Sequence, residues 1–198
     1  MVINLAQDCN RYVLSEKQLI SNFDCGDADL NEFFNYDAIK YRQQMLSETY
    51  FYRHKSSGKI VCAFSFSASG IKTADLPGSR RKKVKEYIPR EKTLKLYPGM
   101  LIGRLGVATE FSKQGIGSQL IKAIKAFCYI QFPGCVRFLL VDAYNAPTVI
   151  RFYQKNDFAE VFSTEEQEKD AYKQFPSELL QTRYMFFDMI QWRDKMIL

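Results

Sequence analysis

The chain has 198 residues, a formal net charge of +6, 46% hydrophobic residues and five cysteines. That length can bury a full core without disulfide or metal staples, so a single domain over residues 1–198 is predicted. The cysteines are odd in number and show no Cys-x-x-Cys spacing, and no secretory signal is apparent, which argues against a disulfide scaffold. No apolar run is long enough to span a bilayer, which argues against a membrane span. We therefore expect a cytoplasmic protein, and the single histidine, His54, indicates no metal site.

The first part of the chain predicts a strand, a helix and a hairpin. The strand lies near residues 10–14, and the helix covers about 28–45 with Asp27 as its N-cap. The hairpin strands cover 49–53 and 60–67, on either side of a turn at 56–58. The apolar stripe expected on the inner face of the helix consists of Leu30, Phe33, Phe34, Tyr41 and Met45.

A basic insert, residues 72–95, follows the hairpin. It carries nine Lys or Arg residues against three acidic ones, an excess equal to the net charge of the whole chain. Charge runs usually form solvated loops, and the alternative is a surface that contacts a phosphate backbone. The residues proposed for that second role are Arg80, Arg81, Lys82 and Lys83.

The next segment reads as a strand, a Gly-x-Gly turn and an amphipathic helix. The strand covers 101–107, and apolar residues recur at helical spacing from Ile116 to Cys128. The unpaired N–H groups at the start of this helix would point at one spot with the helix dipole behind them, which predicts an anion cradle. The alternative is that the two glycines serve only an ordinary strand-to-helix turn, which is the more common role of Gly-x-Gly taken alone. No third glycine at dinucleotide spacing and no Gly-Lys-Ser/Thr follows, which argues against the common nucleotide-binding loops.

The second half continues with a buried strand over 137–143 and a short helix that Pro147 opens. That helix carries Phe152 and Tyr153, and Asp157-Phe158 follows it. Two final strands, near 159–163 and 183–189, would close an antiparallel edge, and the acidic stretch 165–170 is predicted to be a loop.

Taken together, these motifs resemble the GCN5-related N-acetyltransferase (GNAT) family. The resemblance extends to the subgroup that contains the aminoacyl-tRNA-acetylating toxins of bacterial toxin-antitoxin pairs. The additional stretches that carry it are Phe23-Asp24-Cys25-Gly26, Leu30-Asn31, Phe33-Phe34, Thr49-Tyr50 and Gly103-Arg104-Leu105-Gly106-Val107. It implies an α/β (α+β) fold with a mixed, mostly antiparallel sheet, in which helices flank a splayed pair of parallel core strands.

The resemblance also implies a site for acetyl-CoA as cosubstrate. Its pantetheine arm would pair with the backbone of Leu105, Gly106 and Val107, and Tyr153 would be the general acid unless it is an ordinary core tyrosine. Asn145 would bind the cofactor amides or instead cap the Pro147 helix. The diphosphate would lie on Lys113, Gln114, Gly115, Ile116, Gly117 and Ser118.

The acceptor and the partners are less determined. The α-amine of aminoacyl-tRNA is the leading acceptor, with a small amine or a protein N-terminus as the alternative enzyme substrate. Two departures from the family pattern, Ser112 for a basic or amide residue and Asp157 for glycine, keep open a degenerate CoA- or nucleic-acid-binding module without turnover. The subgroup further implies an antitoxin protein as partner and a homodimer.

Overall fold

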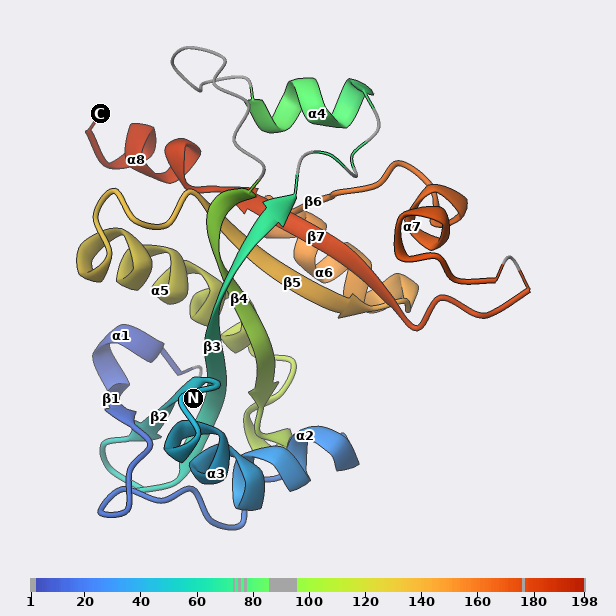
Figure 1. Ribbon diagram of the computed structural model, residues 1–198. Coiled ribbons are helices and arrows are strands. Elements are labelled where there is room, and N and C mark those ends of the chain that lie inside the picture. The colour runs from blue at the N-terminus through green and yellow to red at the C-terminus, as the bar shows by residue number, and fades with distance from the viewer. Residues whose placement is uncertain are drawn as a thin grey trace. The chain divides into compact units, whose positions relative to one another are not determined.

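The computed structural model describes residues 3–72, 74, 76, 78–85, 96–175 and 177–197, but not the side chains at 80, 83, 196 and 197. Arg90, Lys92 and Lys95 of the basic insert lie outside the described residues. Within the described residues, seven strands are hydrogen-bonded in the order β1-β2-β3-β4-β5-β7-β6, and the sheet is mixed and mostly antiparallel, as expected (Figure 1). The chain forms two compact units: unit 1 comprises Met1–Ala68 and Ile102–Ile124, and unit 2 comprises Ser69–Leu101 and Lys125–Leu198.

Unit 1 contains the N-terminal strands and the predicted hairpin. A short helix, α1 (Leu5–Asp8), precedes β1 (Cys9–Val13), which pairs antiparallel with β2 (Glu48–His54). The hairpin between β2 and β3 (Ile60–Lys72) is confirmed, and β3 runs several residues further than predicted. Thr49 and Phe51 lie on the same face of β2, and both are fully buried, which fixes the register of the strand.

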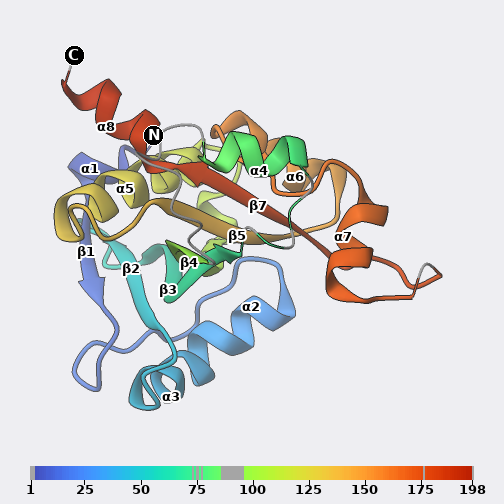
Figure 2. The ribbon, with the colours of Figure 1, turned by 45° about the horizontal axis from the view of Figure 1, so that its top comes forward.

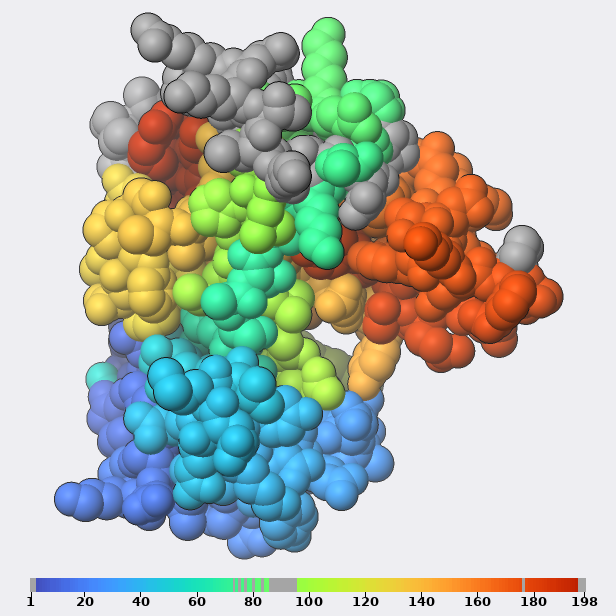
Figure 3. Space-filling model, in the orientation of Figure 1, coloured from blue at the N-terminus to red at the C-terminus, as the bar shows by residue number. Residues whose placement is uncertain are grey.

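The predicted helix over 28–45 is a continuous helical segment with a π-turn inside it (Figure 2). It consists of α2 (Ala28–Glu32), the π-turn Phe33–Asp37 and α3 (Ala38–Gln43), and Asp27 caps it through the Leu30 N–H at 3.0 Å. In Figure 3 the residues of α3 and β2 adjoin on one surface of unit 1.

The π-turn explains why the predicted inner stripe of this helix was partly wrong. Its extra residue rotates the following turn, so Ala38 is fully buried while Tyr41 is 42% exposed. The Tyr41 ring still contacts Phe33, with ring centroids 5.3 Å apart. Met45 lies beyond the last helical residue, adopts a φ of 56° and is 93% exposed.

Unit 2 is built around β5 (Phe138–Tyr144) and β7 (Thr182–Asp188), which pair antiparallel along their whole length. The other strands are the end of β3 from Ser69 onward, part of β4 (Leu96–Val107) and the two-residue edge strand β6 (Ala159–Glu160), which is much shorter than the predicted 159–163. The helices of this unit include α6 (Pro147–Lys155) and α8 (Met189–Ile197), and α5 (Ile116–Gln131) continues into it from unit 1.

One hydrophobic cluster in unit 2 includes residues of the basic insert. The insert contains a helix, α4 (Gly78–Lys85), that the sequence did not predict, and its Val84 is 1% exposed. Helix α4 is therefore anchored to unit 2 by Val84. The buried members of the cluster are Ile71, Leu76, Val84, Tyr97, Phe138, Leu140, Val161, Phe162 and Phe186.

The prediction of a loop for the acidic stretch 165–170 is wrong, because this stretch forms part of helix α7 (Glu165–Tyr172). Thr164 caps it by accepting a hydrogen bond from the Gln167 N–H, and the Gln167 side chain accepts one from Ser163 N–H. The acidic residues occupy the first turn, where negative charge is stabilised by the helix dipole. The acidity was thus a helix-start signal. Among the described residues, no helix has the length and apolarity needed to cross a membrane.

Helix α7 is attached to β7 through a buried ion pair. Glu168 is 1% exposed, and its Oε2 accepts a hydrogen bond from Arg183 Nε at 2.7 Å. Its other carboxylate oxygen accepts the Tyr184 N–H. Burial raises the pKa of Glu168, and Arg183 and the Tyr184 N–H oppose that rise.

We expect Arg183→Met to destabilise the fold by roughly 3–5 kcal/mol, because it leaves the Glu168 charge buried without its cation. The measurement is the free energy of unfolding in urea. Arg193→Met is the matched control: its pair with Asp194 is half exposed, and its loss should cost less than about 1 kcal/mol. Equal losses in the two variants would contradict the assigned role of the buried pair.

Candidate functional site

The predicted anion cradle is formed by the turn between β4 and α5 in unit 1. A short 3-10 helix, Thr109–Phe111, follows β4, and the chain then takes positive φ at Lys113 (59°) and at Gly115 (76°). Helix α5 starts at Ile116, and the Gln119 N–H donates to the Gly115 carbonyl at 3.1 Å. The N–H groups ahead of Gln119 therefore belong to the first turn, where the helix dipole is positive.

The local sequence explains this turn. A Cβ on Gly115 would meet no atom within 4 Å, so glycine is needed there for its φ and not for space. Lys113 holds its left-handed conformation with a Cβ present, at a cost of roughly 1 kcal/mol. Successive turns of this kind form backbone concavities that bind anions. The Lys113 side chain is exposed.

The end of β4 is held by the loop 23–26, so two of the sequence motifs meet in unit 1. Thr109 N–H donates to the Asp24 carbonyl at 2.9 Å, and Ala108 N–H donates to the Val61 carbonyl at 2.9 Å. A Cβ on Gly106 would come within 3.1 Å of the Phe23 ring and 3.2 Å of the Cys25 sulfur. Glycine at 106 thus allows this loop to pack on the strand, beside the predicted cofactor-pairing residues Leu105 and Val107.

Arg104 was not selected from the sequence as a site residue. Its guanidinium lies over the Phe33 ring at 5.2 Å, and its Nε is 3.6 Å from a carboxylate oxygen of Asp29, too far for a hydrogen bond. Nε is buried and makes no hydrogen bond to any described residue. The signal in the sequence was a cation inside an otherwise apolar strand.

Tyr153, the predicted general acid, lies on α6 in unit 2. It is 9% exposed, and its ring packs against Phe152 and Phe158, with centroids 5.0 and 5.5 Å away. Burial raises the pKa of Tyr153 to about 12. The phenol therefore keeps its proton at neutral pH, and burial makes it a weaker acid than an exposed tyrosine.

Asn145 does not cap the Pro147 helix, so that alternative is wrong. The N-cap is Ala146, and Pro147 occupies the first helical turn as predicted. The Asn145 side-chain nitrogen instead donates to Glu165 Oε1 and to the Leu180 carbonyl, both at 3.0 Å. In a side-chain hydrogen bond with a cofactor amide, the Asn145 oxygen would therefore have to accept from the amide N–H.

The four residues proposed as a phosphate-contacting patch all lie on α4. Arg81 and Lys82 are exposed, while the side chains of Arg80 and Lys83 lie outside the described residues. Arg81 Nη2 donates to the carbonyls of Ala74 and Leu76, at 3.2 and 3.0 Å. Arg81 thus contacts residues that precede α4, and residues 78–85 of the insert form a helix rather than the solvated loop considered from the sequence.

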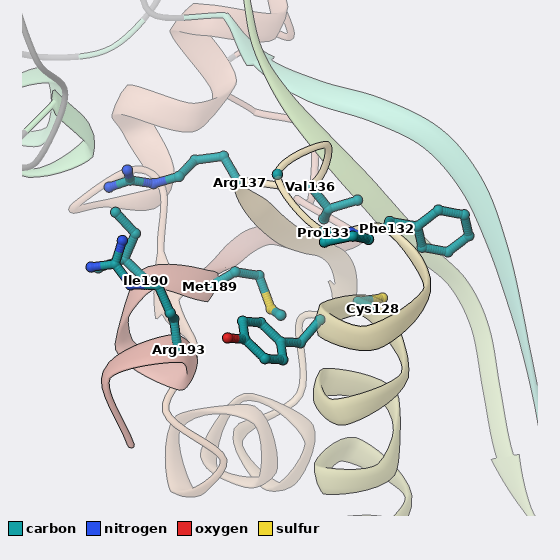
Figure 4. Close-up of a pocket in the computed structure, with 10 residues that line it drawn as sticks. Cys128, Phe132, Pro133, Val136, Arg137, Met189, Ile190 and Arg193 are labelled. Carbon is teal, nitrogen blue, oxygen red and sulfur yellow. The ribbon is translucent and has the colours of Figure 1, made fainter. Parts of the chain in front are cut away.

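Pockets occur in both units, and the predicted cofactor and catalytic residues line neither of the two described below. In unit 2, Met189 and Ile190 of α8 and Cys128 of α5 border a cavity of about 210 Å³ (Figure 4). In unit 1, a polar cavity of about 410 Å³ is bordered by an ion pair between Lys59 and Glu110, with N–O separations of 2.7 and 2.8 Å.

Comparison with known proteins supports the fold. Residues 84–160 match the family model described as "Acetyltransferase (GNAT) domain". The chain is similar to a solved structure of AtaT complexed with acetyl-methionyl-tRNAfMet (TM-score 0.70, 18% identity, 96% of this chain and 99% of that chain). It is also similar to a Tyr-to-Phe mutant of KacT (TM-score 0.66, 16% identity, 96% and 99% covered). A third similar structure is AtaTR bound with AcCoA (TM-score 0.66, 16% identity, 96% and 98% covered). Residues 84–160 thus match a GNAT acetyltransferase domain, and the chain has the fold of the AtaT and KacT structures.

Proposed function

We propose that the protein is an acetyl-CoA-dependent N-acetyltransferase that moves an acetyl group to a primary amine. The observation that carries this proposal is the turn from Lys113 to Gly115, whose positive φ values place a helix N-terminus after β4. The turn and Tyr153 both lie within the segment that matches the acetyltransferase domain. A structure of a similar protein, AtaTR, holds the same cosubstrate.

In this proposal each residue has a defined task. Acetyl-CoA supplies the acyl group as a thioester. The first-turn N–H groups of α5, with Lys113, bind the diphosphate, and the backbone of Leu105, Gly106 and Val107 pairs with the pantetheine arm. A backbone N–H of β4 would stabilise the oxyanion that forms when the amine attacks, a contribution of about 3 kcal/mol in other acyl-transfer enzymes. Tyr153 would protonate the sulfur as the C–S bond breaks.

We propose the α-amine of an aminoacyl-tRNA as the acceptor. An α-amine titrates near neutrality, so part of it is unprotonated without a dedicated base on the protein. The exposed cation Lys82 and its neighbours on α4 would contact the tRNA backbone. The similarity to AtaT, which was solved with acetyl-methionyl-tRNAfMet, favours this acceptor over a small amine or a protein N-terminus. A structure of an AtaT mutant bound to the C-terminus of the antitoxin AtaR likewise favours an antitoxin partner, and a homodimer is also part of the proposal.

Gly117→Glu should abolish acetyl-CoA binding, because a carboxylate in the first turn of α5 would block and repel the diphosphate. Calorimetric titration with acetyl-CoA measures this loss. Lys122→Glu is the control, since it adds a carboxylate to an exposed position further along the same helix and should leave affinity unchanged. Unchanged acetyl-CoA affinity in folded Gly117→Glu protein would show that the diphosphate does not bind at this turn.

Tyr153→Phe should lower kcat by about 10²- to 10⁴-fold with little change in acetyl-CoA affinity, because it keeps the ring packing and deletes the proton donor. Steady-state acetylation of an amine acceptor measures the effect. Tyr129→Phe, which alters another tyrosine of unit 2 at the Figure 4 pocket, should leave kcat unchanged. A wild-type kcat in Tyr153→Phe would make Tyr153 an ordinary core residue.

A triple variant, Arg80, Lys82 and Lys83 to Ser, tests the acceptor and keeps Arg81 for the loop it supports. Binding of tRNA should weaken, and its salt dependence should flatten by roughly 0.7 to 0.9 log units per lost phosphate contact. Acetylation of a free amine should persist. A control with Lys17, Lys155 and Lys173 changed to Ser removes equal charge at other exposed positions. Equal loss of tRNA binding in both variants would mean that net charge, and not α4, is responsible.

A further inference from the structure

Lys125 of α5 is a buried amine that the proposed chemistry does not use. Its side chain is 3% exposed, and its ammonium lies 3.6 Å from the centroid of the Phe187 ring. The rings of Phe158 and Trp192 lie within 5.6 and 6.0 Å of the same nitrogen. Desolvation lowers the pKa of Lys125, and Asp157 opposes that effect. A buried cation of this kind persists only where its hydrogen bonds are satisfied.

The hydrogen bonds of Lys125 go to the turn that ends α6. Its Nζ donates to the Asn156 carbonyl at 2.6 Å and to Asp157 Oδ2 at 3.2 Å. Asn156 is the C-cap of α6, and Asp157 has a φ of 68°, a conformation that a non-glycine residue adopts only at some energetic cost. Lys125 thus supplies both a cation at the negative end of the helix and a partner for the strained residue.

The same turn holds the backbone of Tyr153. The Tyr153 carbonyl accepts hydrogen bonds from Asn156 N–H and from Phe158 N–H, both at 3.0 Å. The Phe158 ring contacts Tyr153 and also lies within 5.6 Å of the Lys125 ammonium. Lys125 is therefore connected to Tyr153 through one hydrogen-bonded turn and through one shared aromatic ring.

We propose that Lys125 is a positioning residue for Tyr153, which fixes the last turn of α6 so that the phenol is held where it can donate its proton. The proposal rests on the role of Tyr153 in the proposed function. Displacement of a catalytic group by about 1 Å can cost on the order of 10²-fold in rate, so a residue that touches no substrate can control turnover.

The test is a double-mutant cycle between Lys125→Met and Tyr153→Phe. Methionine keeps an unbranched apolar stem of similar length and removes the ammonium. In the wild-type background we expect Lys125→Met to lower kcat by roughly 10- to 100-fold with unchanged acetyl-CoA affinity. In the Tyr153→Phe background it should change kcat by less than about 2-fold, because the group that Lys125 positions is already missing.

Lys195→Met is the matched control. Lys195 contacts the same Asp157 carboxylate from the exposed side at 3.5 Å, so its loss should leave kcat unchanged. Should Lys125→Met fail to fold, Asp157→Asn takes its place: it removes the carboxylate charge that pairs with the Lys125 ammonium, and its smaller loss of kcat should also vanish in Tyr153→Phe.

The outcomes separate the two proposals. A kcat loss that is equal in both backgrounds, or absent in both while Tyr153→Phe remains slow, overturns the positioning role and leaves Tyr153 as the acid. A wild-type kcat in Tyr153→Phe overturns the acid role and the positioning role together.

Discussion

The candidate site depends on one backbone reversal, the turn from Lys113 to Gly115. The chain leaves β4 at Val107, passes through the 3-10 helix Thr109–Phe111, and enters α5 at Ile116 after the positive φ values at Lys113 and Gly115. The buried residues Ile116, Leu120 and Ile124 fix the helix behind the turn. The strained conformation of Lys113 is therefore compensated by apolar burial one turn further on, as is common at functional sites.

Most of the strands and helices could be predicted because their periodicity and boundary residues are local signals. The β2–β3 hairpin, the Pro147 helix and the Asp27 cap were all readable, since each depends on residues close in the chain. Helix α7 was not predicted because its composition suggested a loop, although Thr164 and the acidic first turn are helix-start signals. The π-turn between α2 and α3 was not predicted for another reason. A regular period of 3.6 residues per turn does not allow for an inserted residue, so the buried and exposed faces after Phe34 were assigned incorrectly.

The site residues were predictable where backbone chemistry dictated them and unpredictable where long-range contacts did. Gly115 was identified from its place between strand and helix, and the structure gives it a positive φ. The pairing of Lys125 with Asn156 and Asp157 joins residues 31 and 32 positions apart in the sequence, and no local pattern announces it. Likewise, Asn145 preceded a helix and looked like a cap, but its amide is drawn to Glu165 and Leu180 instead.

The shortness of β6 has a consequence for association between copies of the chain. An edge strand offers its free N–H and C=O groups to any extended segment that can pair with it, and such edges promote aggregation. With only Ala159 and Glu160 in the strand, this edge offers too few groups in line for another strand to add stably. Self-association of the protein by extension of the sheet at β6 is therefore not expected.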